Sequence, residues 1–292
     1  MAETTVQPAL PPPDEVSSRQ FDLTIKRLAD DLTYGNDASR FVGPGIDYAQ
    51  TRPYVPGDSI RAVDWKVTAR TGRFHVKDYD APKRVSVYVV VDTSQSMAAS
   101  SGPLSKQGLA VWAAAAIGLA AIRRRSPVSI VSGGERGGVP PPTLSRSLLM
   151  RWMDEVRTER PGERTLAAAR LDQILRIAER MSLVVLISDL HEPGMVDAAI
   201  RLRQRHDVVV LQTVDPAEGG ALRAGFMRGE EAETGAAVFV RSGLRFAGMD
   251  RGRRLADGAV DHVLVRTDEP VGAILAALKR CVHARGGGRI AR

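Results

Sequence analysis

The sequence predicts an α/β fold in which a mostly parallel central sheet is flanked by helices. From residue 85 onward, apolar strand-like segments alternate with helix-like segments, a pattern typical of β-α-β units. The segment VSVYVVV at residues 85–91 is apolar almost throughout, as expected for a strand covered on both faces. Acidic residues follow three of the strand-like segments, at the edge of the sheet where α/β proteins bind ligands.

The part of the chain before residue 85 is polar, mixed in charge and rich in turns. Residues 21–32 carry apolar side chains at helical spacing, and VDWKVTAR at residues 63–70 is typical of a short helix. Beyond residue 85 we expect strands at 85–91, 128–131, 183–187, 208–214 and 263–265, and helices at 104–125, 144–156, 166–178, 196–204 and 272–283.

These patterns divide the chain into four regions. We expect a disordered, proline-rich tail at residues 1–20, a small N-terminal α+β extension at 21–83 that packs on the core, the main α/β domain at 84–285, and a flexible tail at 286–292.

Composition indicates a soluble globular protein, since 43% of the 292 residues are hydrophobic and 26% are charged. Lys and Arg together outnumber Asp and Glu by 41 to 34, which indicates either codon bias or an acidic partner. The basic residues are mostly scattered, which favours codon bias. Cys281 is the single cysteine, so an intramolecular disulfide is excluded. We expect no signal peptide, because residues 1–18 lack its basic and apolar regions, and the longest apolar stretch, 109–122, is shorter than the roughly 20 residues that span a bilayer. We therefore expect a cytoplasmic protein with no membrane span.

A candidate metal site follows the first strand of the predicted sheet. Asp92, Ser94 and Ser96 stand at alternate positions in the motif D-x-S-x-S. Short oxygen side chains at this spacing can converge on one ion, and one carboxylate with two hydroxyls suits a small hard cation such as Mg²⁺. The set is incomplete, so further ligands must come from later loops or from a partner's carboxylate.

Three more residues are candidates because of their positions. Asp189 and Asp215 follow later strands, and Thr165 precedes a predicted helix. Taken alone, Thr165 is as well explained as a helix N-cap. In combination with D-x-S-x-S, these residues point to a site at the carboxyl edge of the sheet.

The motif Asp92, Ser94, Ser96, followed by Thr165 and Asp189, resembles the metal-ion-dependent adhesion site of von Willebrand factor A (vWA) domains in order and spacing. Residues 43–80 narrow the resemblance. Their elements R-x-Y-x-x-G-D, starting at Arg52, and D-W-x-x-x-A-R, starting at Asp64, are similar to those of the bacterial domain-of-unknown-function 58 family, and the likeness extends over about residues 21–279.

The resemblance implies a Rossmann-like vWA domain with a Mg²⁺ site, Mn²⁺ and Ca²⁺ being the alternative ions. It implies direct hydroxyl ligation by Ser94, Ser96 and Thr165, with Asp92 and Asp189 acting mainly through water. It also implies a non-enzymatic interaction or adaptor role beside a MoxR-type AAA+ ATPase in chaperone-like assembly or maturation, through an acidic group of a client or partner. Many relatives carry N-terminal membrane helices, which we do not expect in this protein, and Glu163 and Arg164 stand where relatives have smaller residues.

Two alternatives belong to other functional classes. Phosphatases of the haloacid dehalogenase type need a second Asp at position 94, where this chain has Ser94, and no P-loop or G-x-S-x-G motif is present in the sequence. The hypothesis of a basic nucleic-acid-binding protein is supported by net charge alone, so we expect no nucleic-acid partner. The five histidines show no metal-ligand spacing that would predict a zinc site.

Overall fold

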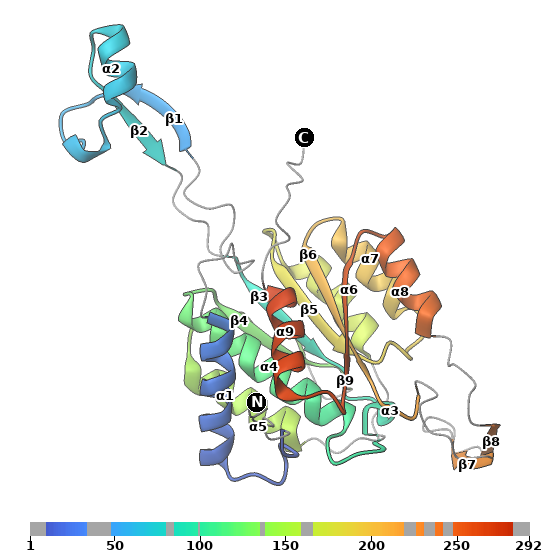
Figure 1. Ribbon diagram of the computed structural model, residues 1–292. Helices are drawn as coiled ribbons and strands as arrows, with labels where there is room; N and C mark the ends of the chain where they lie inside the picture. Colours follow the sequence, from blue (N-terminus) through green and yellow to red (C-terminus); the bar gives the residue numbers. More distant parts are fainter. Residues whose placement is uncertain are drawn as a thin grey trace, which may run out of the picture.

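The computed structural model describes residues 10–33, 48–79, 85–98, 100–134, 138–158, 166–218, 226–230, 237–241 and 248–282. Its centre is a five-stranded sheet in the order β4-β3-β5-β6-β9, with all neighbouring strands parallel (Figure 1). The strands are β3 (Val87–Val91), β4 (Val128–Ser132), β5 (Leu183–Ser188), β6 (Asp207–Val214) and β9 (Asp261–Arg266). The predicted α/β class and its Rossmann-like parallel sheet are confirmed.

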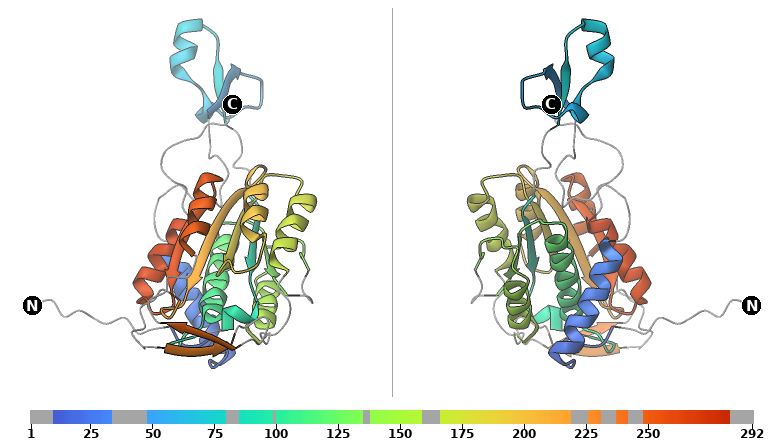
Figure 2. Two further views of the ribbon diagram at one scale, coloured as in Figure 1. Left: turned by 90° about the vertical axis from the view of Figure 1, so that its right-hand side faces the viewer. Right: turned by 90° about the vertical axis from the view of Figure 1, so that its left-hand side faces the viewer.

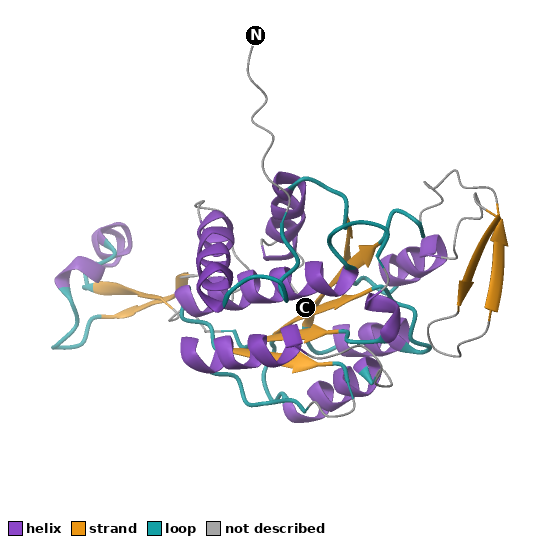
Figure 3. Cartoon of the chain, turned by 90° about the horizontal axis from the view of Figure 1, so that it is seen from below, coloured by secondary structure: helices purple, strands orange, loops and turns teal. Residues whose placement is uncertain are grey.

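Helices cover both faces of this sheet (Figures 2 and 3). One face carries α1 (Ser18–Thr33), α4 (Lys106–Arg123), α5 (Arg146–Thr158) and α9 (Val271–Val282), and the other carries α6 (Ala167–Ile177), α7 (Met195–Arg203) and α8 (Gly248–Asp257). The short helix α3 (Gln95–Ala98) follows β3.

The side chains of β3 show why the sheet needs cover on both faces. Val87, Val89 and Val91 belong to the core cluster under α4, whereas Tyr88 and Val90 belong to the cluster under α6 and α7. Successive side chains of a strand point to opposite faces, so an apolar residue at every position predicts two covered faces.

Helix α4 is the most buried helix of the described structure, with buried residues on all its sides. It lies against the sheet and is covered in turn by α1 and α5 (Figure 2). Trp112 is the largest of its buried side chains, and its ring stacks at a tilt on that of Phe21, with 4.8 Å between centroids.

The segment before α1 packs on the same helices. Trp112 Nε1 donates a hydrogen bond of 2.8 Å to the carbonyl of Pro11. Arg157 of α5 donates to the carbonyls of Pro13 and Val16, at 3.0 Å each. The expected disordered tail at residues 1–20 is therefore too long, because the chain from residue 10 is tied to α4 and α5; residues 1–9 lie outside the described part.

Residues 48–79 form a small unit of their own, drawn apart from the sheet in Figure 1. It contains β1 (Tyr48–Pro53), the 3₁₀ turn η1 (Ile60–Ala62), α2 (Trp65–Thr71) and β2 (His75–Tyr79), with β1 and β2 antiparallel. Asp64 caps α2 by accepting hydrogen bonds from the backbone of residues 66 and 67, and Gly72 ends the helix at φ 68°, a left-handed conformation that glycine adopts without strain. Helix α1 packs on the core as expected for the N-terminal extension, whereas packing of residues 48–79 on the core stays a prediction.

An ion pair closes the turn after β1. Both terminal guanidinium nitrogens of Arg52 donate to the carboxylate of Asp58 at 2.7 Å, and the N–H of Val55 donates to the same carboxylate at 2.9 Å. The hydrogen bonds from Arg52, and then that from Val55, lower the pKa of Asp58 to about 2.

Arg52→Gln is expected to return the pKa of Asp58 toward its ordinary value near 4. Since the folded pKa lies below the unfolded one, the stabilisation of this turn is present above about pH 4 and is lost as the pH falls through about 2. A carboxyl NMR titration measures this directly. Arg70→Gln on α2 is the matched control, and an unchanged Asp58 titration in Arg52→Gln would show that the ion pair is not the cause.

The chain between β6 and β9 contains elements that the sequence pattern does not predict. Strands β7 (Phe226–Glu230) and β8 (Ala237–Arg241) pair as an antiparallel hairpin, and α8 precedes β9. None of the helices within the described ranges has the length and apolar character needed to cross a membrane.

Candidate metal centre

The carboxyl edge of the sheet has a topological switch point between β3 and β5. The chain runs from β3 to β4 on one side and then crosses to β5 on the other side of β3. Loops that leave neighbouring strands in opposite directions open a crevice, which is where α/β proteins bind ligands. Asp92 follows β3 and Asp189 follows β5, so both predicted acids stand at this crevice.

Asp92 is fully buried at the end of β3. Its Oδ1 accepts a hydrogen bond of 3.0 Å from Ser94 N–H, and its Oδ2 accepts one of 2.6 Å from the hydroxyl of Ser188. Burial, and then the nearby negative charge of Asp189, raise the pKa of Asp92. A buried carboxylate beside a second one is stabilised by a bound cation.

The hydroxyls of Ser94 and Ser96 lie next to each other in the turn that leads into α3. Their Oγ atoms are 3.0 Å apart and hydrogen-bonded to each other. Two adjacent ligands of an octahedral Mg²⁺, each at about 2.1 Å from the ion, are also separated by about 3.0 Å. Ser94 is buried and Ser96 is more exposed, so the pair fits a cation that is reached from solvent.

Asp189 has hydrogen-bond donors at both carboxylate oxygens. Oδ1 accepts from His191 N–H at 3.1 Å, while Oδ2 lies 2.7 Å from Lys106 Nζ and 3.1 Å from His191 Nδ1. Burial raises its pKa, but the hydrogen bond from His191 and the charge of Lys106 outweigh burial, so the pKa is lowered and Asp189 stays ionised. With its oxygens engaged in this way, Asp189 suits contact with an ion through water.

Lys106 and Ser188 are site residues that the sequence reasoning missed. Lys106 is the first residue of α4, and its fully buried ammonium also pairs with Glu218. A lysine at a helix start normally faces solvent, so its position gave no signal. Ser188 ends β5 directly before Asp189, and only the fold shows that its hydroxyl reaches Asp92 across the neighbouring strand.

The loop after β5 is strained where it passes the site. Leu190 is buried and has φ 63°, a left-handed conformation that costs a non-glycine residue about 1–2 kcal/mol. Its N–H donates to the hydroxyl of Ser188 at 2.8 Å. Such strain is held where the surrounding contacts fix a functional geometry.

Thr165, the remaining predicted ligand, lies outside the described residues. Its neighbour Leu166 donates a backbone hydrogen bond of 2.7 Å to Gly133. Gly133 lies so close to β3 that a Cβ atom there would come within 3.2 Å of the Cα of Asp92. The chain directly after Thr165 is therefore anchored beside Asp92.

Asp215, the third acid at a strand end, has a structural role. Its carboxylate accepts hydrogen bonds from the backbone and the hydroxyl of Ser101, and from the N–H of Ala217 at 2.8 Å. These bonds tie the loop between α3 and α4 to the end of β6.

A second group of possible ligands lies beside the first. Single ligand atoms of Asp189, His191 and Glu218 all lie within 4.8 Å of one another. The ammonium of Lys106 bonds to two of the three residues, so it already supplies the positive charge there.

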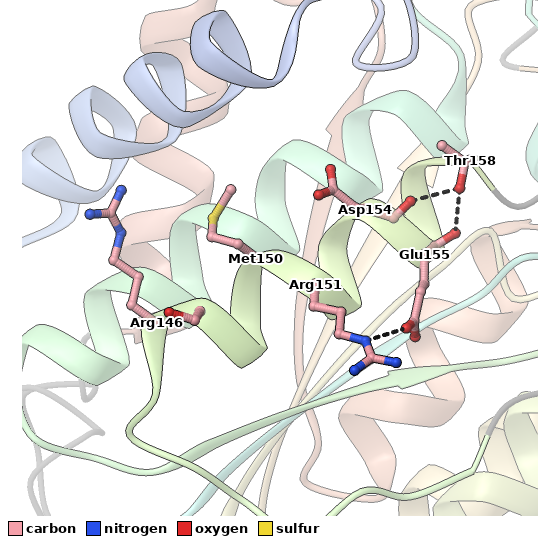
Figure 4. Close-up of a pocket in the computed structure, with 7 residues that line it drawn as sticks. Arg146, Met150, Arg151, Asp154, Glu155 and Thr158 are labelled. Atoms are coloured by element: carbon pink, nitrogen blue, oxygen red, sulfur yellow. Dashed lines mark hydrogen bonds and ion pairs between the residues drawn. The ribbon is translucent and has the colours of Figure 1, made fainter.

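A surface hollow of about 670 Å³ lies along α5 (Figure 4). One helix lines it, and Arg151 and Glu155 pair with each other across 3.3 Å within it. We assign it no part in the metal centre.

Two comparisons by sequence give relatives of unknown function. The model of the family described as Protein of unknown function DUF58 matches residues 50–250. Uncharacterized proteins of Mycobacterium bovis and Mycobacterium tuberculosis are 30% identical over 222 residues, covering 74% of this chain and 70% of each relative.

Comparison with solved structures gives distant likenesses. Proximal thread matrix protein 1 from the mussel byssus has 14% sequence identity and a TM-score of 0.39, over 68% of this chain and 46% of that one. The Ro protein of Deinococcus radiodurans has 14% identity and a TM-score of 0.33, over 93% of this chain and 49% of that one. The chain thus spans about half the length of both structures, and we base no argument on them.

Proposed function

The chain belongs to the DUF58 family of proteins of unknown function, and from this premise we propose that it is a vWA-type interaction module that binds an acidic group of a partner protein through a Mg²⁺ ion. The ion would lie at the crevice between β3 and β5. Mn²⁺ and Ca²⁺ are the alternative ions.

One observation carries the proposal: two hydroxyls with the spacing of adjacent Mg²⁺ ligands stand beside a buried carboxylate at the switch point of the sheet. The Oγ atoms of Ser94 and Ser96 are 3.0 Å apart, and Asp92 is fully buried next to them. The backbone N–H of Ser94 holds the carboxylate of Asp92 in place, so the turn is organised around this site.

The residues of the proposed site have two different tasks. Ser94, Ser96 and Thr165 would supply hydroxyl oxygens, while Asp92 and Asp189 would balance the charge through water. A Mg²⁺ ion held by few negative ligands supplies an electrophilic position that a partner's carboxylate can occupy. Hydrogen bonds hold the carboxylates of Asp92 and Asp189 in their orientations, both with and without a bound partner.

The resemblance to DUF58 proteins with a vWA domain suggests the partner. We propose a MoxR-type AAA+ ATPase, with this chain as its adaptor in the assembly or maturation of a client protein in the cytoplasm. We propose no enzymatic activity, because Ser94 occupies the position where a phosphatase of the haloacid dehalogenase type would need a second acid.

Binding of a MoxR-type ATPase is therefore expected to require both a divalent ion and the serine hydroxyls. The full chain should capture the ATPase in Mg²⁺ and lose it in EDTA, and Ser96→Ala should weaken capture by about tenfold or more. Ser147→Ala, an exposed serine on α5, is the matched control and should bind normally. Equal capture in EDTA and in Mg²⁺ would rule out adhesion through the metal.

A further inference from the structure

Lys106 is a buried cation that bonds to Asp189, one of the acids of the candidate metal centre. Its side chain is 0% exposed, and its Nζ lies 2.7 Å from Asp189 Oδ2. On its other side it pairs with Glu218, which follows β6. The ammonium therefore joins the start of α4 to the loops after two strands.

A lysine is buried at this depth only when carboxylates compensate the loss of water. Burial lowers the pKa of Lys106, but the charges of Asp189 and Glu218 outweigh burial and raise it. The ammonium is thus held between two carboxylates, Asp189 and Glu218. Asp189 directs the same oxygen, Oδ2, to Lys106 and to His191.

The carboxyl groups of the cluster fit one lysine and one divalent ion. Lys106 pairs with Asp189 and Glu218 and balances one of their two charges. A divalent ion beside Asp92 would balance the remaining charge and favour the ionised form of Asp92, whose pKa is raised by burial and then by Asp189. Without Lys106 the cluster would attract any cation more strongly, because the Coulomb energy follows the net charge.

We propose that Lys106 is the built-in counter-cation of the metal centre, which keeps Asp189 from ligating the ion directly and weakens divalent-ion binding enough for the ion to exchange. This inference rests on the proposed function, since it concerns the regulation of the same site. Lys106 acts through Asp189, so it is a positioning residue. Because Lys106 already balances part of the negative charge, the fold does not depend on the metal. Occupancy of the site can therefore vary with the metal concentration and with partner binding.

Hydrogen bonds around Glu218 link Lys106 to the loop after β6 and to the loop before α4. Glu218 accepts a bond of 3.4 Å from the N–H of Asp215, whose carboxylate holds Ser101 in the loop before α4. Lys106 therefore connects the metal edge with the two loops that border it.

The test measures binding of Mn²⁺ to the full chain, by electron paramagnetic resonance and by calorimetry. Lys106→Met should raise the affinity by at least about tenfold, because a positive charge that pairs with Asp189 is removed. Glu218→Gln, which removes one negative charge, should lower the affinity. The double variant should return toward the wild-type value, and Lys66→Met on the exposed surface of α2 should change nothing.

Each outcome decides the inference. If the wild type binds Mn²⁺ and Lys106→Met binds it with equal or lower affinity, the counter-cation role is overturned while the metal site stands. If neither the wild type nor the variants bind Mn²⁺, both the inference and the proposed function are overturned. If Lys106→Met folds only with Mn²⁺, the inference is supported. If Lys106→Met does not fold at all, the affinity of Glu218→Gln for Mn²⁺ decides. An unchanged or higher affinity in Glu218→Gln rejects the inference.

Discussion

Asp92→Asn is expected to lower the affinity for Mg²⁺ by about 10–100-fold, while the metal-free protein remains at least as stable as the wild type. Asn keeps the shape of the side chain and an acceptor for the N–H of Ser94. It removes the negative charge that the ion needs. It also removes the repulsion between two buried carboxylates, which is why the metal-free fold should not suffer.

The same variant should change how stability depends on pH. The pKa of Asp92 is raised by burial and then by the charge of Asp189, so the folded value lies above the unfolded one. In the metal-free wild type, the contribution of Asp92 is fully favourable below about pH 4 and is lost as the pH rises through the folded pKa. Asp92→Asn should remove this loss.

Calorimetric titration with Mg²⁺ and thermal unfolding in EDTA at several pH values measure both effects. Asp172→Asn is the matched control, because Asp172 pairs with Arg201 on the exposed surface of α6 and α7. A wild-type affinity for Mg²⁺ in Asp92→Asn would remove Asp92 from the metal centre. A large drop in metal-free stability would instead assign it a structural role.

The main fold could be predicted from the sequence because its central strands are largely runs of aliphatic residues. The segment at β3 is apolar at every position, and β5 is apolar up to its last residue, Ser188, as expected for a parallel strand between two helical layers. Strands β1, β2, β7 and β8 lack that pattern, since they form two-stranded sheets outside the main sheet. Their pairing depends on turns and partners that periodicity does not reveal.

Only those site residues that directly follow a predicted strand could be predicted from the sequence. Asp92, Ser94, Ser96 and Asp189 stand in loops that follow predicted strands, so the order of the strands brings them to one edge. Lys106 reaches that edge from the start of a helix, and a lysine there has the same sequence pattern whether it faces solvent or a buried carboxylate. Tertiary packing alone makes the difference.

Trp112→Ala is expected to destabilise the protein by about 3–5 kcal/mol, the usual cost of deleting a buried Trp or Phe side chain. Trp112 lies in α4 between the sheet and α1, and its ring contacts that of Phe21. The substitution leaves a cavity, and it also removes the hydrogen bond from Trp112 Nε1 to the carbonyl of Pro11. The segment before α1 should loosen together with the core.

Trp112→Phe separates these two contributions. It keeps an aromatic ring against Phe21 and loses the bond to Pro11, so we expect a cost of about 1–2 kcal/mol. Urea unfolding gives both values, and hydrogen exchange at residues 10–17 reports on the segment. If Trp112→Phe were as destabilising as Trp112→Ala, the bond to Pro11 rather than the packed ring would hold α1 on the core. If neither variant released the segment, Arg157 would be its main anchor, through the carbonyls of Pro13 and Val16.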